Sequence, residues 1–553
     1  MNMYSLGPVT HVENDPVQLK KPVRGCFPLR DRTNEYLIND NFFVFLYNYI
    51  MDKDTVSTKG IFIGVIIGTV LAALMIPLDF FIVNVPRWIC AVLVGAALVA
   101  DVFYCLGKSR RWKKITVSVF GALVWLAVIF FAFFWQYWNS TVYKMRGAPV
   151  SPAYDSVISQ KDALEDLDYA YKHLKRIHPA MLDKKGEEYK TVCAAYEKQR
   201  AEIGAKDGVT LNELARCVQR VYSTLHDAHT GSFPQYTDVL YYRELKKIND
   251  SEYGFHGVNG VPYKDLLQQK SDLFSYEKDA WAIQDLADYT LRIDTLDLLE
   301  LDPTNGVTYM LRNDDGDIIE RKASPEEFVT VEEYYKYNNI DKNAKDKEPA
   351  KPFVYYEIDE EHSLAVLTLT SCQSNSQYRE CLRQMFTEVK EKGIKNVAVD
   401  VRNNGGGSSL VINNFFRYLD IDSFYESGWN VRYGPFVAKH ERPVTKNNRI
   451  KELLFHGNVF VLTSERSFSS AMMFPLYVQD NGLGKIIGET PANDPGGYGD
   501  VVNDYLPNSH IKIYVSKTDF TRVNPDSPDR YVEPDYPCKK GEVMEELYKH
   551  CIK

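Results

Sequence analysis

The sequence predicts an α/β fold whose largely parallel sheet lies in the C-terminal part of the chain, behind a helical transmembrane region. The first observation is an alternation of strand-like and helix-like runs that begins at Phe353. Repeated β-α-β units form parallel sheets, which present functional residues at the carboxyl ends of their strands. The second observation is a set of three long apolar runs near the N-terminus. The alternating runs are strands at 363–369, 397–401 and 459–462, and helices at 378–392, at 408–419 and after Ser469.

The three apolar runs cover residues 61–83, 88–106 and 115–138. Each has about the 20 residues that cross a bilayer, and the third ends in aromatic residues typical of a membrane interface. A basic loop at 108–114 separates the second and third runs, so the positive-inside rule places this loop and residues 1–59 in the cytoplasm. We therefore expect a multi-pass cell-membrane protein that contacts lipid through three spans, with the remainder of the chain outside the cytoplasm. Buried core helices are the alternative, which the uncharged third run disfavours.

Composition and patterning divide the chain into successive segments. The net charge of −9 disfavours nucleic acid as the main partner. An apolar stripe behind a capping box at Thr210–Glu213 predicts helices ahead of the α/β region. The expected segments are a cytoplasmic N-terminal segment (1–59), a transmembrane region (60–138), a linker (139–155), a helical cap (156–235), a mixed α/β insert (236–350) and a core that carries the candidate site (351–553).

Two turns that follow predicted strands carry the residue types that acyl transfer needs. After the strand at 459–462 comes the hydroxyl-rich run Thr463–Ser470, and then a helix. A serine there lies beside a helix N-terminus, whose free N–H groups stabilise an anion. After the strand at 397–401 comes the run Gly405–Gly407, whose backbone can approach a ligand closely and direct N–H groups at it. The alternative is that the hydroxyl groups only cap the helix.

Four ordered motifs resemble the core of the tail-specific, or C-terminal processing, serine peptidases. They are Asp-Val-Arg-Asn-Asn-Gly-Gly-Gly at 400–407, Ser-Phe-Ser-Ser-Ala at 467–471, Gln-Asp-Asn-Gly at 479–482 and Ile-Gly-Glu-Thr at 487–490. The resemblance covers roughly residues 155–540, and the order and spacing of the four motifs make it specific. It implies a ClpP/crotonase-like β-α-β core, a helical N-terminal cap and a mixed α/β insert that is PDZ-like or divergent.

The resemblance places the nucleophile at Ser469, the third residue of Ser-Phe-Ser-Ser-Ala. Ser464, Ser467 and Ser470 are the rival hydroxyl groups. Many bacterial relatives use a lysine about 25 residues downstream as the base that a serine requires. Counting from Ser469 reaches Asp494, so residue identity disfavours a Ser–Lys dyad. The resemblance therefore indicates the histidine-using, tricorn-core-like branch of the family.

His229 is the expected general base, because Asp-Ala-His-Thr at 227–230 resembles the Asp-x-His-Thr motif of the histidine-using relatives. An imidazole, whose ordinary pKa is about 6.5, accepts a proton near neutrality. His226 is the alternative base. The resemblance implies Glu533 as the acid that orients the histidine, and Asp227 is the local alternative. A metal site made of His226, Asp227 and His229 is disfavoured, because three ligands within four residues rarely face one ion.

The backbone N–H groups of Gly406 and Ser470 are the expected oxyanion hole. The sequence thus predicts a membrane-anchored serine endopeptidase with a Ser/His/Glu acyl-enzyme mechanism, which needs no metal and no cofactor. The resemblance implies that its substrates are extended or unfolded polypeptides outside the cytoplasm. The alternative is a non-catalytic ligand-binding or sensor protein on the same fold. The sequence does not set the oligomeric state.

Six cysteines follow the third apolar run. An even number outside the cytoplasm permits disulfides. The local pairs Cys372–Cys381 and Cys538–Cys551 are the simplest pairing, and six free thiols are the alternative.

Overall fold

The computed structural model describes residues 147–249, 251–313, 315–340, 352–434 and 436–552, together with Trp112, Ile115 and Val119. The predicted cytoplasmic segment (1–59) and, apart from Ile115 and Val119, the three predicted spans lie outside the described residues. Within the described ranges, no helix combines the length and the apolar character that a membrane span requires. The chain divides into two compact units, 2–135 and 136–553, and the second unit contains the predicted cap, insert and core.

Three α-helices occupy most of the segment 156–235, for which the sequence predicts a helical cap. Ser159 caps its first helix by accepting the N–H of Asp162, and Thr210 forms the predicted capping box with Glu213. The helices pack against each other and against Val502, Ile513 and Val515 of an antiparallel sheet in the core. The elements are β1 (Val157–Ser159), α6 (Gln160–Ile177), η2 (Pro179–Leu182), α7 (Glu187–Gly204), β2 (Gly208–Thr210), α8 (Leu211–Tyr222), η3 (Ser223–Leu225) and β3 (Gly231–Phe233).

The insert is mixed α/β, as predicted, and its likeness to a PDZ domain stays a prediction. It contains a four-stranded antiparallel sheet in the order β6-β5-β7-β8. Its elements are β4 (Tyr241–Tyr242), α9 (Leu245–Asn249), β5 (Gly254–Val258), β6 (Val261–Pro262), α10 (Tyr263–Gln269), η4 (Ser271–Leu273), α11 (Asp279–Tyr289), α12 (Ile293–Leu298), β7 (Val307–Arg312), β8 (Ile318–Ala323), η5 (Pro325–Glu327), β9 (Phe328–Val329) and α13 (Val331–Tyr337).

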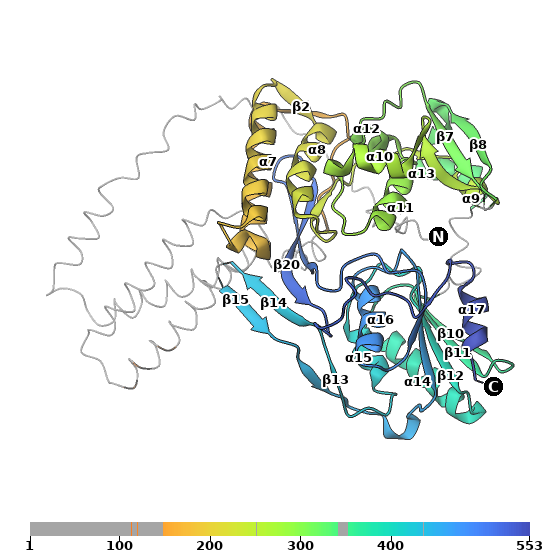
Figure 1. Ribbon diagram of the computed structural model, residues 1–553. Helices are drawn as coiled ribbons and strands as arrows, with labels where there is room; N and C mark the ends of the chain where they lie inside the picture. The colour runs from red at the N-terminus through yellow and green to blue at the C-terminus, as the bar shows by residue number, and fades with distance from the viewer. Residues whose placement is uncertain are drawn as a thin grey trace, which may run out of the picture. The chain divides into compact units, whose positions relative to one another are not determined.

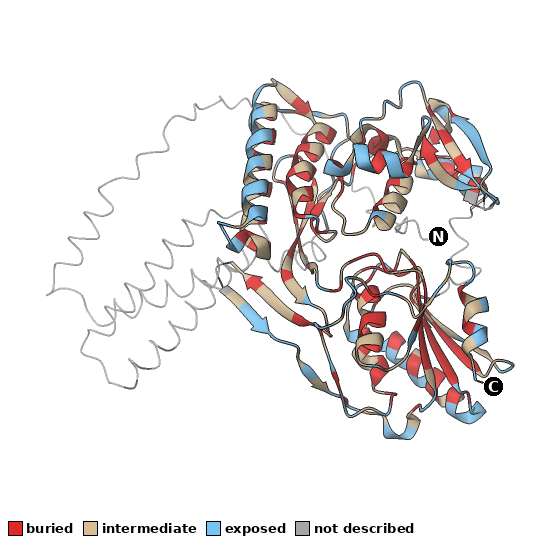
Figure 2. Cartoon of the chain, in the orientation of Figure 1, coloured by how far each residue is buried: buried red, intermediate tan, exposed pale blue. Residues whose placement is uncertain are grey.

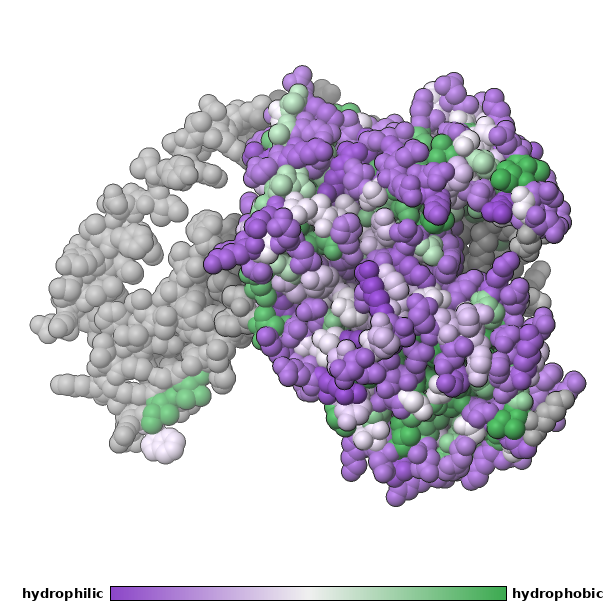
Figure 3. Space-filling view, viewed as in Figure 1, coloured by the Kyte–Doolittle hydropathy of each residue, from purple (hydrophilic) through white to green (hydrophobic). Residues whose placement is uncertain are grey.

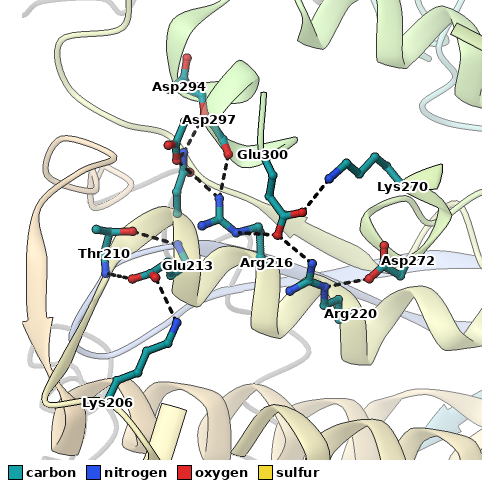
Figure 4. A network of polar contacts seen from close by, with 11 residues as sticks. Lys206, Thr210, Glu213, Arg216, Arg220, Lys270, Asp272, Asp294, Asp297 and Glu300 are labelled. Atoms are coloured by element: carbon teal, nitrogen blue, oxygen red, sulfur yellow. Dashed lines mark hydrogen bonds and ion pairs between the residues drawn. The ribbon is translucent and has the colours of Figure 1, made fainter. Parts of the chain in front are cut away.

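Ion pairs attach the insert to helix α8 of the cap (Figure 4). Arg216 and Arg220 point from α8 toward the insert, and Arg220 pairs with both Asp272 (2.8 Å) and Glu300 (3.0 Å). Lys270 pairs with the same Glu300 at 2.6 Å. Sharing Glu300 among several cations costs less side-chain entropy than forming separate surface pairs. The network therefore helps to hold helix α8 against the insert.

The core contains the predicted parallel sheet. Its order is β10-β11-β12-β17-β18-β21, and only the edge strand β10 runs antiparallel to its neighbour. The predicted strands and helices at 363–419 and 459–478 are confirmed within a few residues. The sheet strands are β10 (Val354–Asp359), β11 (Leu364–Leu369), β12 (Asn396–Asp400), β17 (Asn458–Thr463), β18 (Lys485–Gly488) and β21 (Tyr536–Pro537), and the helices are α14 (Ser376–Lys392), α15 (Leu410–Phe416), α16 (Ser470–Asp480) and α17 (Val543–His550).

Helices cover both faces of this sheet, which explains its apolar strands. Helices α14, α15 and α16 pack on one face and α17 on the other (Figure 1). Buried residues gather in the strands, whereas the visible face of the described part is largely hydrophilic (Figures 2 and 3). Strands β12 and β17 are adjacent, with Asp400 opposite Leu462. The two turns that follow these strands therefore start side by side.

A second, antiparallel sheet, which the sequence did not predict, brings the cap to the core. Its order is β15-β14-β20-β19, and the cap strand β3 pairs with β20. Since β3 begins two residues after His229, this pairing fixes the loop that carries the histidine. The remaining elements are β13 (Ser423–Tyr425), β14 (Gly428–Tyr433), β15 (Phe436–His440), β16 (Val444–Lys446), η7 (Lys451–Leu453), β19 (Tyr498–Tyr505) and β20 (Lys512–Thr521).

The predicted disulfides Cys372–Cys381 and Cys538–Cys551 are wrong, because all six described cysteines are free thiols. Cys372 lies buried at the end of the β11 segment, where its Sγ contacts the side-chain oxygen of Asn404 at 3.6 Å. Its thiol therefore packs inside the core, against the glycine loop.

Candidate active site

The structure separates Ser469 from its three rivals. Ser467 donates to the carbonyl of Val401 at 2.9 Å, Ser470 donates to that of Gly407 at 2.9 Å, and Ser464 donates to a neighbouring backbone carbonyl. All three rivals are buried, whereas Ser469 is partly exposed. Among the described residues, the hydroxyl of Ser469 has no hydrogen-bond partner. Ser469 is therefore the serine with a reachable and uncommitted hydroxyl group.

The backbone at Ser469 is strained in a way that presents this hydroxyl. Its φ of 56° and ψ of −124° are unusual for a residue with a side chain, and it sits between strand β17 and helix α16. Sharp strand-to-helix turns of this kind expose a nucleophilic serine above a sheet. The side-chain oxygen of Asn493 accepts the Ser469 N–H at 2.8 Å and holds the turn. No sequence motif marks this role of Asn493, which lies one residue before Asp494, the position that the lysine of a Ser–Lys dyad would occupy.

The glycine loop lies directly against the serine. A Cβ atom on Gly406 would lie 2.7 Å from the Cβ of Ser469 and 3.2 Å from its Oγ, so only glycine fits there. The N–H of Gly406 donates to the side-chain oxygen of Asn404 at 2.8 Å. Ser470 opens helix α16, so its N–H has no acceptor inside the helix. Of the two predicted oxyanion donors, Ser470 therefore offers an open N–H and Gly406 one that Asn404 occupies.

His229 lies beside the nucleophile turn. Its ring stacks on Phe468, the residue before Ser469, with centroids 4.4 Å apart and planes 23° apart. Both ring nitrogens are buried without a hydrogen-bond partner of normal geometry among the described residues. The alternative base, His226, is exposed and has a left-handed backbone with φ of 49°. The structure therefore places His229, and not His226, against the nucleophile turn.

Asp227 anchors the histidine loop. Its Oδ1 accepts the backbone N–H of His229 at 2.8 Å and lies 3.9 Å from the ring Nδ1, while its Oδ2 lies 3.1 Å from Nε2 of His178. Burial alone would raise the pKa of Asp227, but the His178 hydrogen bond and the charges of His178 and His229 lower it to about 2. Burial lowers the pKa of His229 against the attraction of Asp227. At neutral pH the site thus holds an ionised acid beside a neutral imidazole.

The structure places Glu533 away from His229. Glu533 is exposed, and its Oε2 accepts the hydroxyl hydrogen of Thr490 at 2.6 Å. The acidic groups whose charges act on His229 are Asp227 and Asp500. The geometry therefore brings Ser469, His229, Gly406 and Ser470 together and leaves Glu533 out.

Glu277, from the loop before α11, joins the site without any signal in the sequence, where Tyr-Glu-Lys at 276–278 resembles a solvated surface. One donor atom each from Asp227, His229 and Glu277 lie within 4.8 Å of one another, and these are the residues in the described part that could hold a metal ion. The Glu277 carboxyl accepts the N–H groups of Ala228 (3.3 Å) and Asp494 (2.5 Å). Because both acids already accept protein N–H groups, the arrangement favours a hydrogen-bonded acid–base cluster over a cation site.

Comparisons with known proteins show what this chain resembles. Residues 363–537 match the model of peptidase family S41. The fold is similar to a mutant of CPAF (13% identity, TM-score 0.50, 71% of this chain and 95% of that chain) and to mature CPAF (13%, 0.49, 70% and 95%). It is also similar to the photosystem II D1 C-terminal processing protease (13%, 0.39, 70% and 97%). No curated protein sequence matches the chain.

A serine on a strained turn, a histidine against that turn and an adjacent glycine loop define the class of serine-type peptidases. The matched residues contain the glycine loop, the nucleophile turn and the whole of strands β11, β12, β17 and β18. Residues 363–537 therefore carry a peptidase family S41 domain, and the predicted resemblance to the tail-specific serine peptidases is confirmed.

Proposed function

We propose that this protein is a serine endopeptidase in which Ser469 is the nucleophile and His229 the general base. The observation that carries the proposal is that Ser469 has the one uncommitted hydroxyl of its turn and directly follows Phe468, on whose ring His229 stacks. His229 takes the proton of Ser469 as Oγ attacks a peptide carbonyl, and it returns this proton to the leaving amine. Water then hydrolyses the acyl-enzyme, with His229 again acting as base.

Asp227 replaces Glu533 in this proposal as the acid that orients the histidine. Its carboxylate faces Nδ1 at 3.9 Å, and this contact has to shorten when the imidazolium forms. The tetrahedral oxyanion receives the N–H of Ser470 and a second N–H from the glycine loop. If Gly406 supplies the second donor, its N–H has to leave the side-chain oxygen of Asn404. Losing one such donor typically costs about 10²–10³ in rate.

The membrane-anchored form of this proposal rests on the three predicted spans and the basic loop between two of them. The catalytic part then lies outside the cytoplasm and acts on extended or unfolded polypeptides, as the family resemblance implies. An impermeant protease added to intact cells tests the topology. It should degrade the part that carries Ser469 and spare an epitope placed within residues 1–59.

A serine-reactive probe tests the chemistry. The full-length protein in detergent is labelled with a fluorophosphonate and incubated with an unfolded protein, and peptide fragments are read by mass spectrometry. We expect Ser469→Ala and His229→Ala to lose labelling and cleavage. Ser470→Ala keeps its backbone N–H and should still label. Labelling that persists in Ser469→Ala would refute the nucleophile assignment, and an unlabelled but folded parent would favour the ligand-binding alternative.

A further inference from the structure

The segment from Glu277 to Trp281, supplied by the insert, contacts the nucleophile turn, the histidine loop and the core loop that contains Asp494. The indole of Trp281 stacks on Phe468, with centroids 4.8 Å apart and planes 9° apart. Lys278 Nζ donates to the carbonyl of Thr490 at 2.9 Å, and the Tyr531 hydroxyl donates to the carbonyl of Glu277 at 2.9 Å. The segment is therefore fixed to the core by one ring stack and two hydrogen bonds.

The carboxyl group of Glu277 joins two loops that lie far apart in the sequence. One oxygen accepts the N–H of Ala228, the neighbour of His229, at 3.3 Å. The other accepts the N–H of Asp494, the neighbour of Asn493, at 2.5 Å. Asn493 in turn holds the backbone of Ser469. A continuous chain of contacts thus runs from the base loop through Glu277 to the nucleophile.

The charge state of Glu277 is also unusual. Burial, and next the nearby Asp227 carboxylate, raise its pKa to about 8, while the two backbone N–H groups oppose this shift. Withdrawing this carboxyl group from water costs free energy, which the two N–H groups that it accepts offset in part. Acidic residues with strongly shifted pKa values cluster at functional sites.

We propose that Glu277 is a positioning residue that the insert contributes to the peptidase site. Its carboxyl group holds the His229 loop against the Asn493 loop and so sets the distance between base and nucleophile. This inference rests on the proposed roles of Ser469 and His229. It assigns the insert a part in catalysis itself.

The test compares Glu277→Ala and Glu277→Gln with Glu300→Gln in the full-length protein. Glutamine retains one oxygen acceptor and the length of the side chain, whereas alanine removes both acceptors. Glu300 is an insert acid of similar connectivity that lies in the network with Arg220 and Lys270 (Figure 4), so its variant controls for a general loosening of the insert. The readouts are kcat and KM for one peptide, the rate of fluorophosphonate labelling, and the melting curve.

We expect Glu277→Ala to lower kcat about 100-fold with little change in KM, because a displacement near 1 Å costs about this factor and Glu277 does not touch the substrate. Glu277→Gln should lose about tenfold, and Glu300→Gln less than about twofold. The wild-type pH–rate profile should also change slope near pH 8, a change that Glu277→Gln abolishes.

Two results would overturn the inference. One is a folded Glu277→Gln variant with wild-type kcat and an unchanged pH profile. The other is a loss in Glu300→Gln equal to that in both Glu277 variants, which would indicate a merely structural effect. A wild-type protein that neither labels nor cleaves would instead reject the proposed function, so the two failures are distinguishable.

Discussion

Replacing Gly406 with alanine should inactivate the peptidase while its neighbour tolerates the same change. The added Cβ would lie 2.7 Å from the Cβ of Ser469 and 2.8 Å from the carbonyl oxygen of Phe468. Ordinary contacts of such atoms need about 3.5–4 Å, so the two turns must separate by about 1 Å. The φ of 100° adds strain of about 1–3 kcal/mol. A displacement near 1 Å costs about 100-fold in rate.

The assay measures fluorophosphonate labelling and peptide hydrolysis, alongside thermal unfolding of each variant. Gly405→Ala is the matched control, because a Cβ on Gly405 meets no atom within 4 Å. We expect Gly405→Ala to stay within about threefold of wild type, whereas Gly406→Ala loses about 100-fold in labelling rate and melts earlier. Equal activity of the two variants would refute the close approach of the glycine loop to the nucleophile.

Three further predictions concern Asn493, Asp227 and the thiols. Asn493→Ala removes the acceptor of the Ser469 N–H and should lower kcat about tenfold at unchanged KM, which steady-state kinetics measures. The pKa of Asp227 falls from 3.8 in the unfolded chain to about 2 in the folded protein. Ionised Asp227 therefore contributes about 2 kcal/mol to the free energy of unfolding above pH 3.8, and this contribution is lost as the pH falls toward 2. Asp227→Asn should remove this pH dependence of the free energy of unfolding, which denaturant titrations between about pH 2 and pH 4 measure. Alkylation of the unreduced, unfolded protein should modify all six described cysteines, and a smaller mass increase would contradict the free thiols.

The parallel core could be predicted from the sequence because its strands are locally continuous and apolar. The strand from Val397 to Val401 is largely buried on both faces, so its sequence is a continuous apolar run. This run predicts a buried strand, and the glycines that follow predict where the strand ends. The second sheet could not be predicted in the same way. Its strands β14 and β20 alternate polar and apolar residues, and they pair across about ninety positions, while β20 also pairs with a strand of the cap. Nothing local specifies such a partner.

The residues of the candidate site also fall into two groups, those that the sequence predicts and those that it does not. Ser469, His229 and Gly406 lie in motifs whose residues are neighbours in sequence, so their roles could be predicted. Glu277 acts through backbone N–H groups 49 and 217 positions away, and backbone donors leave no trace in the sequence. The resemblance implies a role for Glu533 through its position in the chain alone, whereas the fold directs its carboxylate to Thr490.

Two carboxyl groups beside one imidazole are useful only if their charge states differ. If both were ionised, their combined charge would raise the pKa of His229 and weaken it as an acid toward the leaving amine. The structure separates their pKa values: against the effect of burial, the hydrogen bond from His178 lowers the pKa of Asp227 to about 2, while burial and Asp227 itself raise the pKa of Glu277 to about 8. One negative charge is then available to stabilise the imidazolium, and the neutral Glu277 can hold the two loops without adding a second. Because the pKa values of the two acids shift in opposite directions, we assign them different roles. Asp227 stabilises the charge of the protonated His229, and Glu277 positions the loop that carries His229.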